Sequence, residues 1–132
     1  GSIIVILGTD LPLSQTQLQR LAKRGAMGIA RTGSPGGHYS GDIILAFSVA
    51  NSRVLPRLGT DDPPLVESFD YIVDHYMGQV YEAAVQAVEE AIINALVAAE
   101  TVDLVKAAGE KLKAIDHEQL RAAMEEYNRL SG

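Results

Sequence analysis

The chain has 132 residues, which is the length of one domain, and we expect residues 1–132 to form a single domain. Its 11 Lys and Arg against 17 Asp and Glu give a formal net charge of −6, which argues against nucleic acid and anionic membrane surfaces as partners. The absence of cysteine excludes a disulfide framework and thiolate chemistry.

The first predicted element is a strand at 3–7, where a continuous β-branched, apolar run suits a strand covered on both faces. The run is too short for a signal peptide or a membrane span, and no basic residue precedes it. No compartment is assigned, although the cytoplasm is slightly favoured.

An amphipathic helix follows in the prediction. Ser14 with Gln17 is a capping-box start, and Gly33 suits the C-cap. Apolar and small residues recur between them at helical spacing, namely Leu18, Leu21, Ala22, Gly25 and Ile29.

A glycine-rich loop at 33–41 then leads into a second strongly apolar strand at 42–50. A polar connection containing prolines occupies 51–64. We expect a long helix from Pro63, because acidic residues precede it and prolines suit a first helical turn. Gly78 lies within its apolar stripe and indicates a kink or a close contact. The stripe comprises Phe69, Ile72, Val73, Tyr76, Val80, Ala83, Ala84, Ala87, Val88, Ala91, Ile92, Ala95 and Ala99.

The last third gives weaker signals. Gly109 is expected to end a continuation of the long helix or a short second helix, and 112–115 is predicted as a short edge strand. Asp116 with Gln119 is a cap signature for a final helix. One face of that helix is predicted to carry Leu120, Met124 and Tyr127.

The predicted order is β-α-β-α-(β)-α, which indicates an α/β layered fold. Two or three strands make a small sheet, and the apolar strands require cover on both faces. We therefore expect this chain to complete a sheet whose other strands come from another polypeptide.

No metal or cofactor is predicted. His38, His75 and His117 are scattered, and no cluster of His, Asp and Glu has ligand spacing. The glycine-rich loop matches neither of the common phosphate-binding patterns.

The junction Gly1-Ser2 has two interpretations. A serine before a buried strand suits an N-terminal nucleophile, because cleavage of the Gly1–Ser2 bond frees an α-amine beside the Ser2 hydroxyl. Gly-Ser is also the dipeptide that expression vectors commonly leave before a cloned sequence, and the dipeptide alone favours that origin.

A second candidate site is Ser40-Gly41-Asp42, where the glycine-rich loop enters the second strand. Its hydroxyl and carboxylate together could hold an ammonium or an amine. The alternative is ordinary turn chemistry, in which Ser and Asp cap loops, and the motif alone favours this alternative.

Four segments in order, 1–10, 30–34, 40–48 and 89–101, resemble the L-aminopeptidase/D-esterase (DmpA-like) family, which includes the β-peptidyl aminopeptidases. They read GSIIVILGTD, ARTGS, SGDIILAFS and EEAIINALVAAET. Several ordered motifs are more specific than any single short pattern, and they make Gly1-Ser2 a processing site rather than a vector remnant.

The resemblance implies a precursor that cuts itself between Gly1 and Ser2 into a larger α chain and a smaller β chain, which stay together. This sequence resembles the β chain, with Ser2 as nucleophile and Ser40 and Asp42 as its polar partners. The implied fold is an αββα sandwich like that of N-terminal-nucleophile hydrolases, assembled as a tetramer of αβ pairs. The implied substrates are short peptides, amides and esters with a free N-terminal amine, including β-amino acid residues in some members, and other site residues lie on the α chain.

Two departures from the family pattern leave alternatives. With the Gly1–Ser2 bond intact, Ser2 has no free amine, which fits either an unprocessed chain or a non-catalytic assembly subunit that keeps the fold. A different N-terminal-nucleophile activity, such as acyl transfer, is a third possibility. The family usually continues Met-Thr-Gly after Thr101, whereas this chain has Val102-Asp103-Leu104, so 102–132 is less securely assigned.

Overall fold

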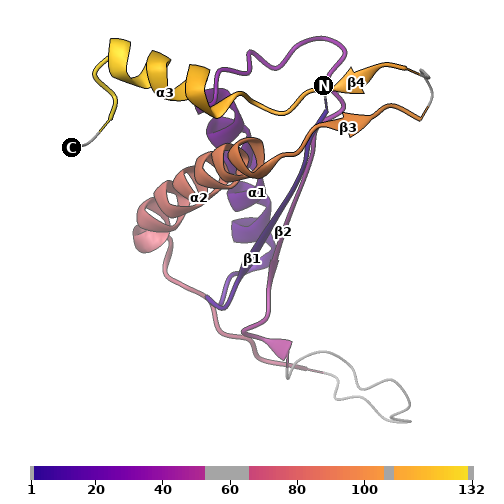
Figure 1. The fold of residues 1–132 in the computed structure, drawn as a ribbon. Coiled ribbons are helices and arrows are strands. Elements are labelled where there is room, and N and C mark those ends of the chain that lie inside the picture. Colours follow the sequence, from indigo (N-terminus) through magenta and orange to yellow (C-terminus); the bar gives the residue numbers. More distant parts are fainter. Residues whose placement is uncertain (1, 53–65, 106–108, 131–132) are drawn as a thin grey trace. The chain divides into compact units, whose positions relative to one another are not determined.

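The computed structural model describes residues 2–52, 66–105 and 109–130 (Figure 1). The chain divides into two compact units, Gly1–Glu89 and Glu90–Gly132, and each is described by itself. The expectation that all 132 residues form one domain therefore stays a prediction.

The first unit is built on two parallel strands. β1 spans Ile4–Thr9 and β2 spans Ile43–Ser48, and they pair from Ile4 opposite Ile43 to Thr9 opposite Ser48. Both strands lie where the apolar, β-branched runs predicted them, because such side chains fit a pleated and packed surface.

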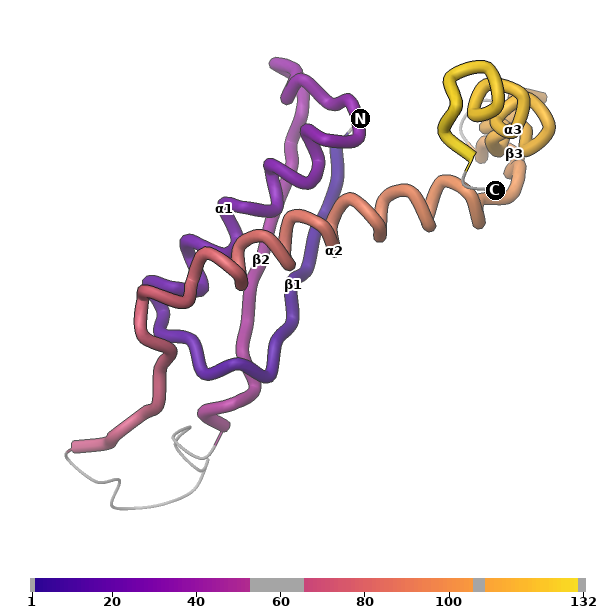
Figure 2. Tube along the Cα trace, turned by 90° about the vertical axis from the view of Figure 1, so that its left-hand side faces the viewer, coloured from indigo at the N-terminus to yellow at the C-terminus, as the bar shows by residue number. Residues whose placement is uncertain are grey.

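Helix α1, Gln15–Arg31, connects the two strands and lies along one face of the pair (Figures 1 and 2). Its predicted capping box is confirmed, because the Ser14 hydroxyl accepts from the Gln17 amide at 3.3 Å and the Gln17 side chain accepts from the Ser14 amide at 3.0 Å. Thr32 is the C-cap and Gly33 follows with a φ of 95°, a left-handed conformation that glycine adopts without strain.

The long helix starts later than predicted. A 3-10 turn, η2, spans Asp74–Tyr76, and helix α2 spans Met77–Ala98, so the predicted start at Pro63 is wrong for the described residues and 63–65 lie outside them. The segment 66–73 is not helical because other partners take its main-chain groups. The Ile72 amide donates to the Pro12 carbonyl at 2.9 Å, and the Gln17 side chain donates to the Ile72 carbonyl at 2.6 Å.

The core of the first unit lies between α1, the strands and the start of α2. Gly28 of α1 sets the approach of the two helices, because a Cβ at this position would lie 2.7 Å from Val88 Cβ and 2.8 Å from the Val85 carbonyl oxygen. A Cβ added at Gly78 would meet nothing within 4 Å among the described residues, so the close contact suggested for it is not found there. The buried core cluster comprises Leu13, Leu21, Met77 and Ala84, with Leu7, Leu18, Ala46, Ile72, Val80 and Tyr81 packed against it.

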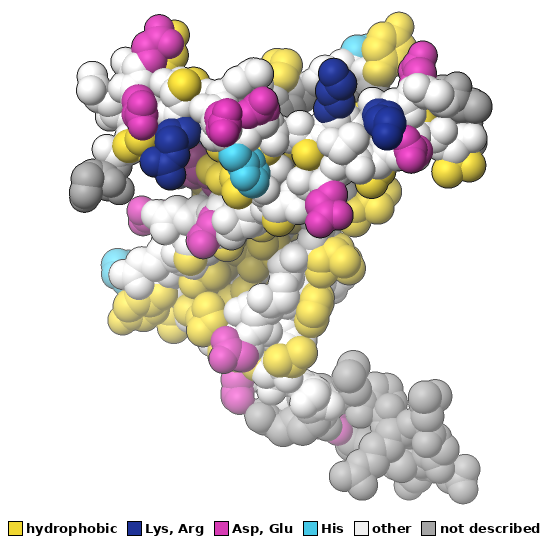
Figure 3. Space-filling model, in the orientation of Figure 1, with side chains coloured by type: hydrophobic (Ala, Val, Ile, Leu, Met, Phe, Trp, Pro, Cys, Tyr) yellow, Lys and Arg dark blue, Asp and Glu magenta, His cyan; other side chains and the backbone are white. Residues whose placement is uncertain are grey.

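The other face of the strand pair is open in this chain. Large apolar side chains cover it and are more than two-fifths exposed, in contrast to the alternate residues that face α1. Figure 3 shows yellow side chains exposed along the strands. Among the described residues, α1 covers one face of the strands and the apolar side chains of the other face stay exposed. The expectation that another polypeptide completes the sheet stays a prediction. The open-face residues are Ile4, Ile6, Ile43, Leu45 and Phe47.

The second unit contains the end of α2, a short hairpin and a last helix. β3, Val102–Asp103, pairs antiparallel with β4, Lys111–Leu112, so the prediction of a helix continuing to Gly109 is wrong. Gly109 instead has a φ of 91° in the hairpin connection, where 106–108 are outside the described residues. The strand predicted at 112–115 is confirmed at its first residue only.

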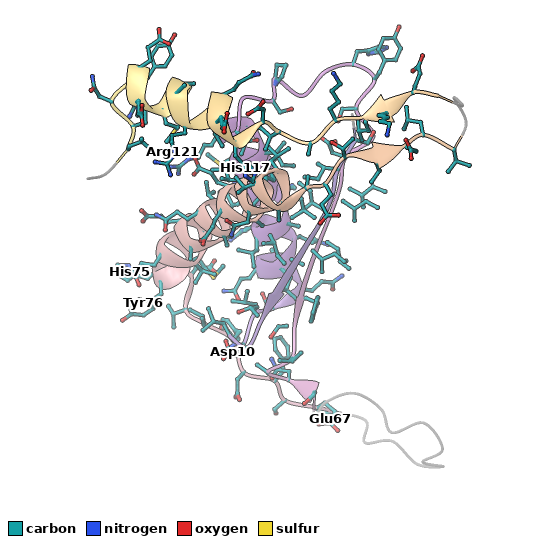
Figure 4. The ribbon with its side chains drawn as sticks, in the orientation of Figure 1. Asp10, Glu67, His75, Tyr76, His117 and Arg121 are labelled. Atoms are coloured by element: carbon teal, nitrogen blue, oxygen red, sulfur yellow. The ribbon has the colours of Figure 1, made fainter. Side chains whose placement is uncertain are left out.

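The last helix is capped as predicted. α3 spans His117–Glu126, and the Asp116 carboxylate accepts from the amides of Glu118 and Gln119 at 2.9 and 3.1 Å. His117 lies at the start of α3 (Figure 4), and its Nε2 is 2.9 Å from the Val97 carbonyl oxygen at the end of α2. In the described ranges, no helix combines the length and apolarity that a membrane span needs.

Candidate active site

The candidate residues meet where the two parallel strands begin. Ser2 precedes β1 and Asp42 precedes β2. Because the amino ends of parallel strands lie at one edge of a sheet, two segments separated by 39 positions come together there. Sequence reasoning selected both segments, and the parallel pairing brings them into contact.

Two hydrogen bonds between side chain and main chain connect the segments. The Gly41 amide donates to Ser2 Oγ at 2.9 Å, and the Ile3 amide donates to Asp42 Oδ1 at 3.0 Å. The next bond along is a main-chain one, from the Ile43 amide to the Ile3 carbonyl at 3.0 Å. The two side chains thus continue the strand pairing beyond the end of the main-chain ladder.

Asp42 is held in its ionised form. Hydrogen bonding from the Ser40 side chain, followed by the Ile3 amide, lowers the pKa of the Asp42 carboxyl below its ordinary value. Asp42 is exposed and Ser40 is half-buried, so the carboxylate remains open to solvent and to other charges. The site therefore carries a fixed negative charge beside Ser2 at neutral pH.

The glycine-rich loop presents Ser40 to the site through a turn. The Ser40 amide donates to the Gly37 carbonyl at 2.9 Å, and Gly36 has a φ of 66° that favours glycine. The turn interpretation of this motif and the site interpretation are thus compatible, because the loop closed by Ser40 also places the Gly41 amide on Ser2 Oγ and the Ser40 side chain on Asp42.

Sequence reasoning missed the role of two main-chain groups, the amides of Ile3 and Gly41. The only signal for the second was its position between Ser40 and Asp42, since a glycine there permits close approach of another chain segment. Gly1, the other residue of the predicted processing site, lies outside the described residues.

A hollow of about 230 Å³ lies beside Asp42, between α1, the loop and the start of β2. Asp42 is the charged group among its lining residues, and most of the others are small or aliphatic. They are Ala26, Ile29, Ala30, Ser34, Pro35, Gly36 and Ile44.

The described part of the chain contains no group of three His, Cys, Asp or Glu side chains that could hold a metal ion. His75 packs edge-on against Tyr76 at the start of α2, with ring centroids 5.2 Å apart (Figure 4). The arrangement at Ser2 offers a hydroxyl, a carboxylate and main-chain donors, which are groups that nucleophilic hydrolysis uses.

Comparison with known proteins finds both a matching family model and similar proteins. Residues 1–109 match the sequence model of Peptidase family S58. The chain is 44% identical over 131 residues to the beta-peptidyl aminopeptidase BapA of Sphingosinicella microcystinivorans. This match covers 99% of this chain and 31% of that protein. The resemblance that the four ordered segments indicated is therefore confirmed.

Solved structures agree. The L-aminopeptidase D-Ala-esterase/amidase of Ochrobactrum anthropi, a prototype for serine aminopeptidases and a variant of the Ntn hydrolase fold, matches with a TM-score of 0.84 and 43% identity, over 96% of this chain and 34% of that one. A beta-aminopeptidase of Burkholderia sp. matches with a TM-score of 0.77 and 33% identity, over 89% and 33% of the two chains. The predicted α/β class resembling N-terminal-nucleophile hydrolases is confirmed, and this chain spans about a third of the length of these relatives.

Proposed function

Because this chain belongs to Peptidase family S58, we propose that it is the nucleophile-bearing β chain of a self-processing N-terminal-serine aminopeptidase. The observation that carries the proposal lies at the start of the strand pair, where the Gly41 amide bonds to Ser2 Oγ and the amide of the next residue, Ile3, bonds to Asp42. Ser2 is the nucleophile, and Ser40 and Asp42 are its polar partners.

The first reaction of the proposed enzyme is cleavage of its own Gly1–Ser2 bond. Ser2 Oγ attacks the Gly1 carbonyl carbon, and an ester replaces the peptide bond. The hydroxyl proton passes to the Ser2 nitrogen, which leaves as a free amine. Water then hydrolyses the ester, which yields the Gly1 carboxylate and restores the Ser2 hydroxyl. Nucleophile and base now reside on one residue.

Peptide hydrolysis uses the new amine as the base. A free α-amine has a pKa of about 7.7–8.0, so part of it is neutral near pH 7. It accepts the Ser2 hydroxyl proton as Oγ attacks the substrate carbonyl, and it returns that proton to the leaving amine when the tetrahedral intermediate collapses. Water hydrolyses the resulting Ser2 ester, while Asp42 and Ser40 orient the amine.

The proposed substrates are short peptides, amides or esters with a free N-terminal amine. Support comes from the relatives, described as a beta-peptidyl aminopeptidase and as an L-aminopeptidase D-Ala-esterase/amidase. The substrate pocket and the donors that stabilise the oxyanion are proposed to lie largely on the α chain, since this chain spans only about a third of its relatives. No cofactor takes part in the proposed reaction.

The proposed partners are the α chain of the same precursor and further αβ pairs, with a tetramer implied by the family resemblance. The open apolar face of β1 and β2 supports association, because contiguous exposed apolar surface marks an interaction site. Nucleic acid and membranes are not proposed as partners, given the net charge of −6.

The test is intact-mass analysis of the full-length precursor and of its Ser2→Ala variant. We expect the wild type to yield a chain beginning at Ser2 and to release N-terminal residues from peptides, and the variant to do neither. An uncleaved but folded wild type favours the non-catalytic assembly subunit. Undiminished peptidase activity in Ser2→Ala rules out the proposed nucleophile. Assays with water and with amine acceptors separate hydrolysis from acyl transfer.

A further inference from the structure

We propose that Gly41 is a positioning residue for the nucleophile, and that its main-chain amide fixes the Ser2 hydroxyl for both reactions. The inference rests on the proposed role of Ser2. Its first ground is the 2.9 Å bond from the Gly41 amide to Ser2 Oγ.

This bond constrains the hydroxyl in two ways. An N–H donor occupies one lone pair of Oγ, so the hydroxyl proton must point elsewhere, which leaves it available to a base. The donor also stabilises negative charge developing on Oγ as the proton departs, and an amide held in place has no reorganisation to undergo at that moment.

The second ground is the space that glycine leaves. A Cβ at Gly41 would lie 3.3 Å from Ser2 Oγ and 4.0 Å from Ser2 Cβ. A separation of 3.3 Å is tighter than ordinary van der Waals contact, so a side chain here displaces the hydroxyl by a few tenths of an ångström. Gly41 does not have a positive φ that would itself demand glycine, so close approach is the reason for glycine at this position.

The neighbouring bond shows why displacement would be local. The Ile3 amide is held by Asp42 Oδ1 at 3.0 Å and the Ile43 amide by the Ile3 carbonyl at 3.0 Å. The backbone that follows Ser2 and Gly41 is thus fixed by bonds of its own, and an added methyl group acts chiefly on the Ser2 hydroxyl.

The experiment compares Gly41→Ala with Gly37→Ala in the full-length protein. Gly37 lies in the same loop and does not have a positive φ, and a Cβ added there would meet nothing within 4 Å. Gly37→Ala therefore makes the same change without a contact to Ser2, and it keeps the Gly37 carbonyl as the acceptor for the Ser40 amide. We expect Gly41→Ala to lower kcat about tenfold with KM within twofold of wild type, and to slow self-cleavage. Small displacements of reacting groups lower rates in this manner. For Gly37→Ala, kcat, KM and the rate of self-cleavage should each stay within twofold of wild type. For every variant, kcat is calculated per processed chain.

Equal behaviour of the two variants, or a change in KM alone, overturns the inference. It does so without touching the proposed function, which is decided separately by Ser2→Ala.

Hydrogen exchange with single-amide resolution provides a second measurement that does not depend on folding of Gly41→Ala. We expect the Gly41 amide to be protected in wild type and to exchange at least tenfold faster in Ser2→Ala, which lacks the acceptor. The Ile43 amide should remain protected in both, because its acceptor is the Ile3 carbonyl. An unprotected Gly41 amide in wild type, or equal loss of protection at Gly41 and Ile43, contradicts the inference.

Discussion

The main-chain amide of Ile3 donates a 3.0 Å hydrogen bond to Asp42 Oδ1 and joins the starts of two parallel strands that are 39 residues apart. This bond fixes the Asp42 carboxylate beside Ile3, the residue that follows Ser2. It also helps the Ser40 side chain to keep Asp42 ionised, since both lower the pKa of that carboxyl. The Asp42 charge therefore has a defined place beside Ser2, and its removal has measurable consequences.

Asp42→Asn keeps an oxygen for the Ile3 amide but removes the negative charge. In the proposed mechanism Asp42 stabilises the protonated Ser2 amine and so raises the pKa of that amine, whereas an amide side chain would not. Because the neutral amine is the proposed base, we expect the acid limb of the kcat profile to move to lower pH. We also expect the maximal kcat to be about tenfold lower, because the amine is less well oriented without the carboxylate.

The measurement is kcat against pH on processed protein. Asp10→Asn is the control, because Asp10 is an exposed carboxylate after the opposite end of β1 (Figure 4). An acid limb that coincides with that of wild type would show that Asp42 does not act on the amine.

Ser40→Ala removes the largest cause of the lowered Asp42 pKa. We expect that pKa to rise toward its ordinary value. A carboxyl with a depressed folded-state pKa contributes stability above its unfolded pKa, and this contribution is lost as pH falls through the folded pKa. In Ser40→Ala the loss should therefore occur at higher pH than in wild type.

The check is a titration of the Asp42 carboxyl carbon by NMR in the labelled protein. Asp74 serves as an internal reference, because its own lowered pKa depends on the Gln17 side chain first and Arg20 next. A joint movement of both carboxyls, or of neither, would refute the assigned cause.

Gly28→Ala should destabilise the first unit. The new Cβ would lie 2.7 Å from Val88 Cβ and 2.8 Å from the Val85 carbonyl oxygen, so helix α1 must shift away from α2. Overpacking of this kind costs about 1–3 kcal/mol, and alanine gains about 1 kcal/mol over glycine in a helix, so the net destabilisation is up to about 2 kcal/mol.

Urea unfolding of the full-length protein measures the effect, with Gly78→Ala as control because a Cβ added there would meet nothing within 4 Å. Gly78→Ala should be neutral or stabilising by up to about 1 kcal/mol. Equal free energies of unfolding for the two variants would contradict the close helix contact.

Leu45→Lys tests the open face of the strand pair. Leu45 is 54% exposed there, and Met27 on α1 is also 54% exposed, so Met27→Lys is a control of equal exposure. A buried ammonium without a partner is strongly disfavoured, so Leu45→Lys should reduce the amount of α chain recovered with the β chain severalfold.

Met27→Lys should leave that recovery unchanged. Size-exclusion chromatography with quantitative staining gives the ratio of chains. Full recovery with Leu45→Lys would mean that the α chain does not cover this face.

Prediction succeeded where the determining interactions are local. The capping box of Ser14 with Gln17 and the cap of Asp116 are set by residues three apart. It failed at 66–73 and at Gly109, where residues outside the local segment decide the backbone conformation. The Ile72 amide bonds to Pro12, which lies 60 positions away, and the residues around Gly109 join two strands that pair with each other.

By itself the sequence determined the two apolar strands, the helix caps and the candidates Ser2, Ser40 and Asp42, because each depends on side-chain type at short spacing. The tertiary structure alone decided which of these groups touch. Parallel pairing of β1 with β2 is a contact between segments 39 positions apart, and it placed the Gly41 amide on Ser2 Oγ and Asp42 on the Ile3 amide. The tertiary structure also decided that one apolar face of the strands is exposed in the described part of the chain, because a single helix layer covers only one side of a sheet.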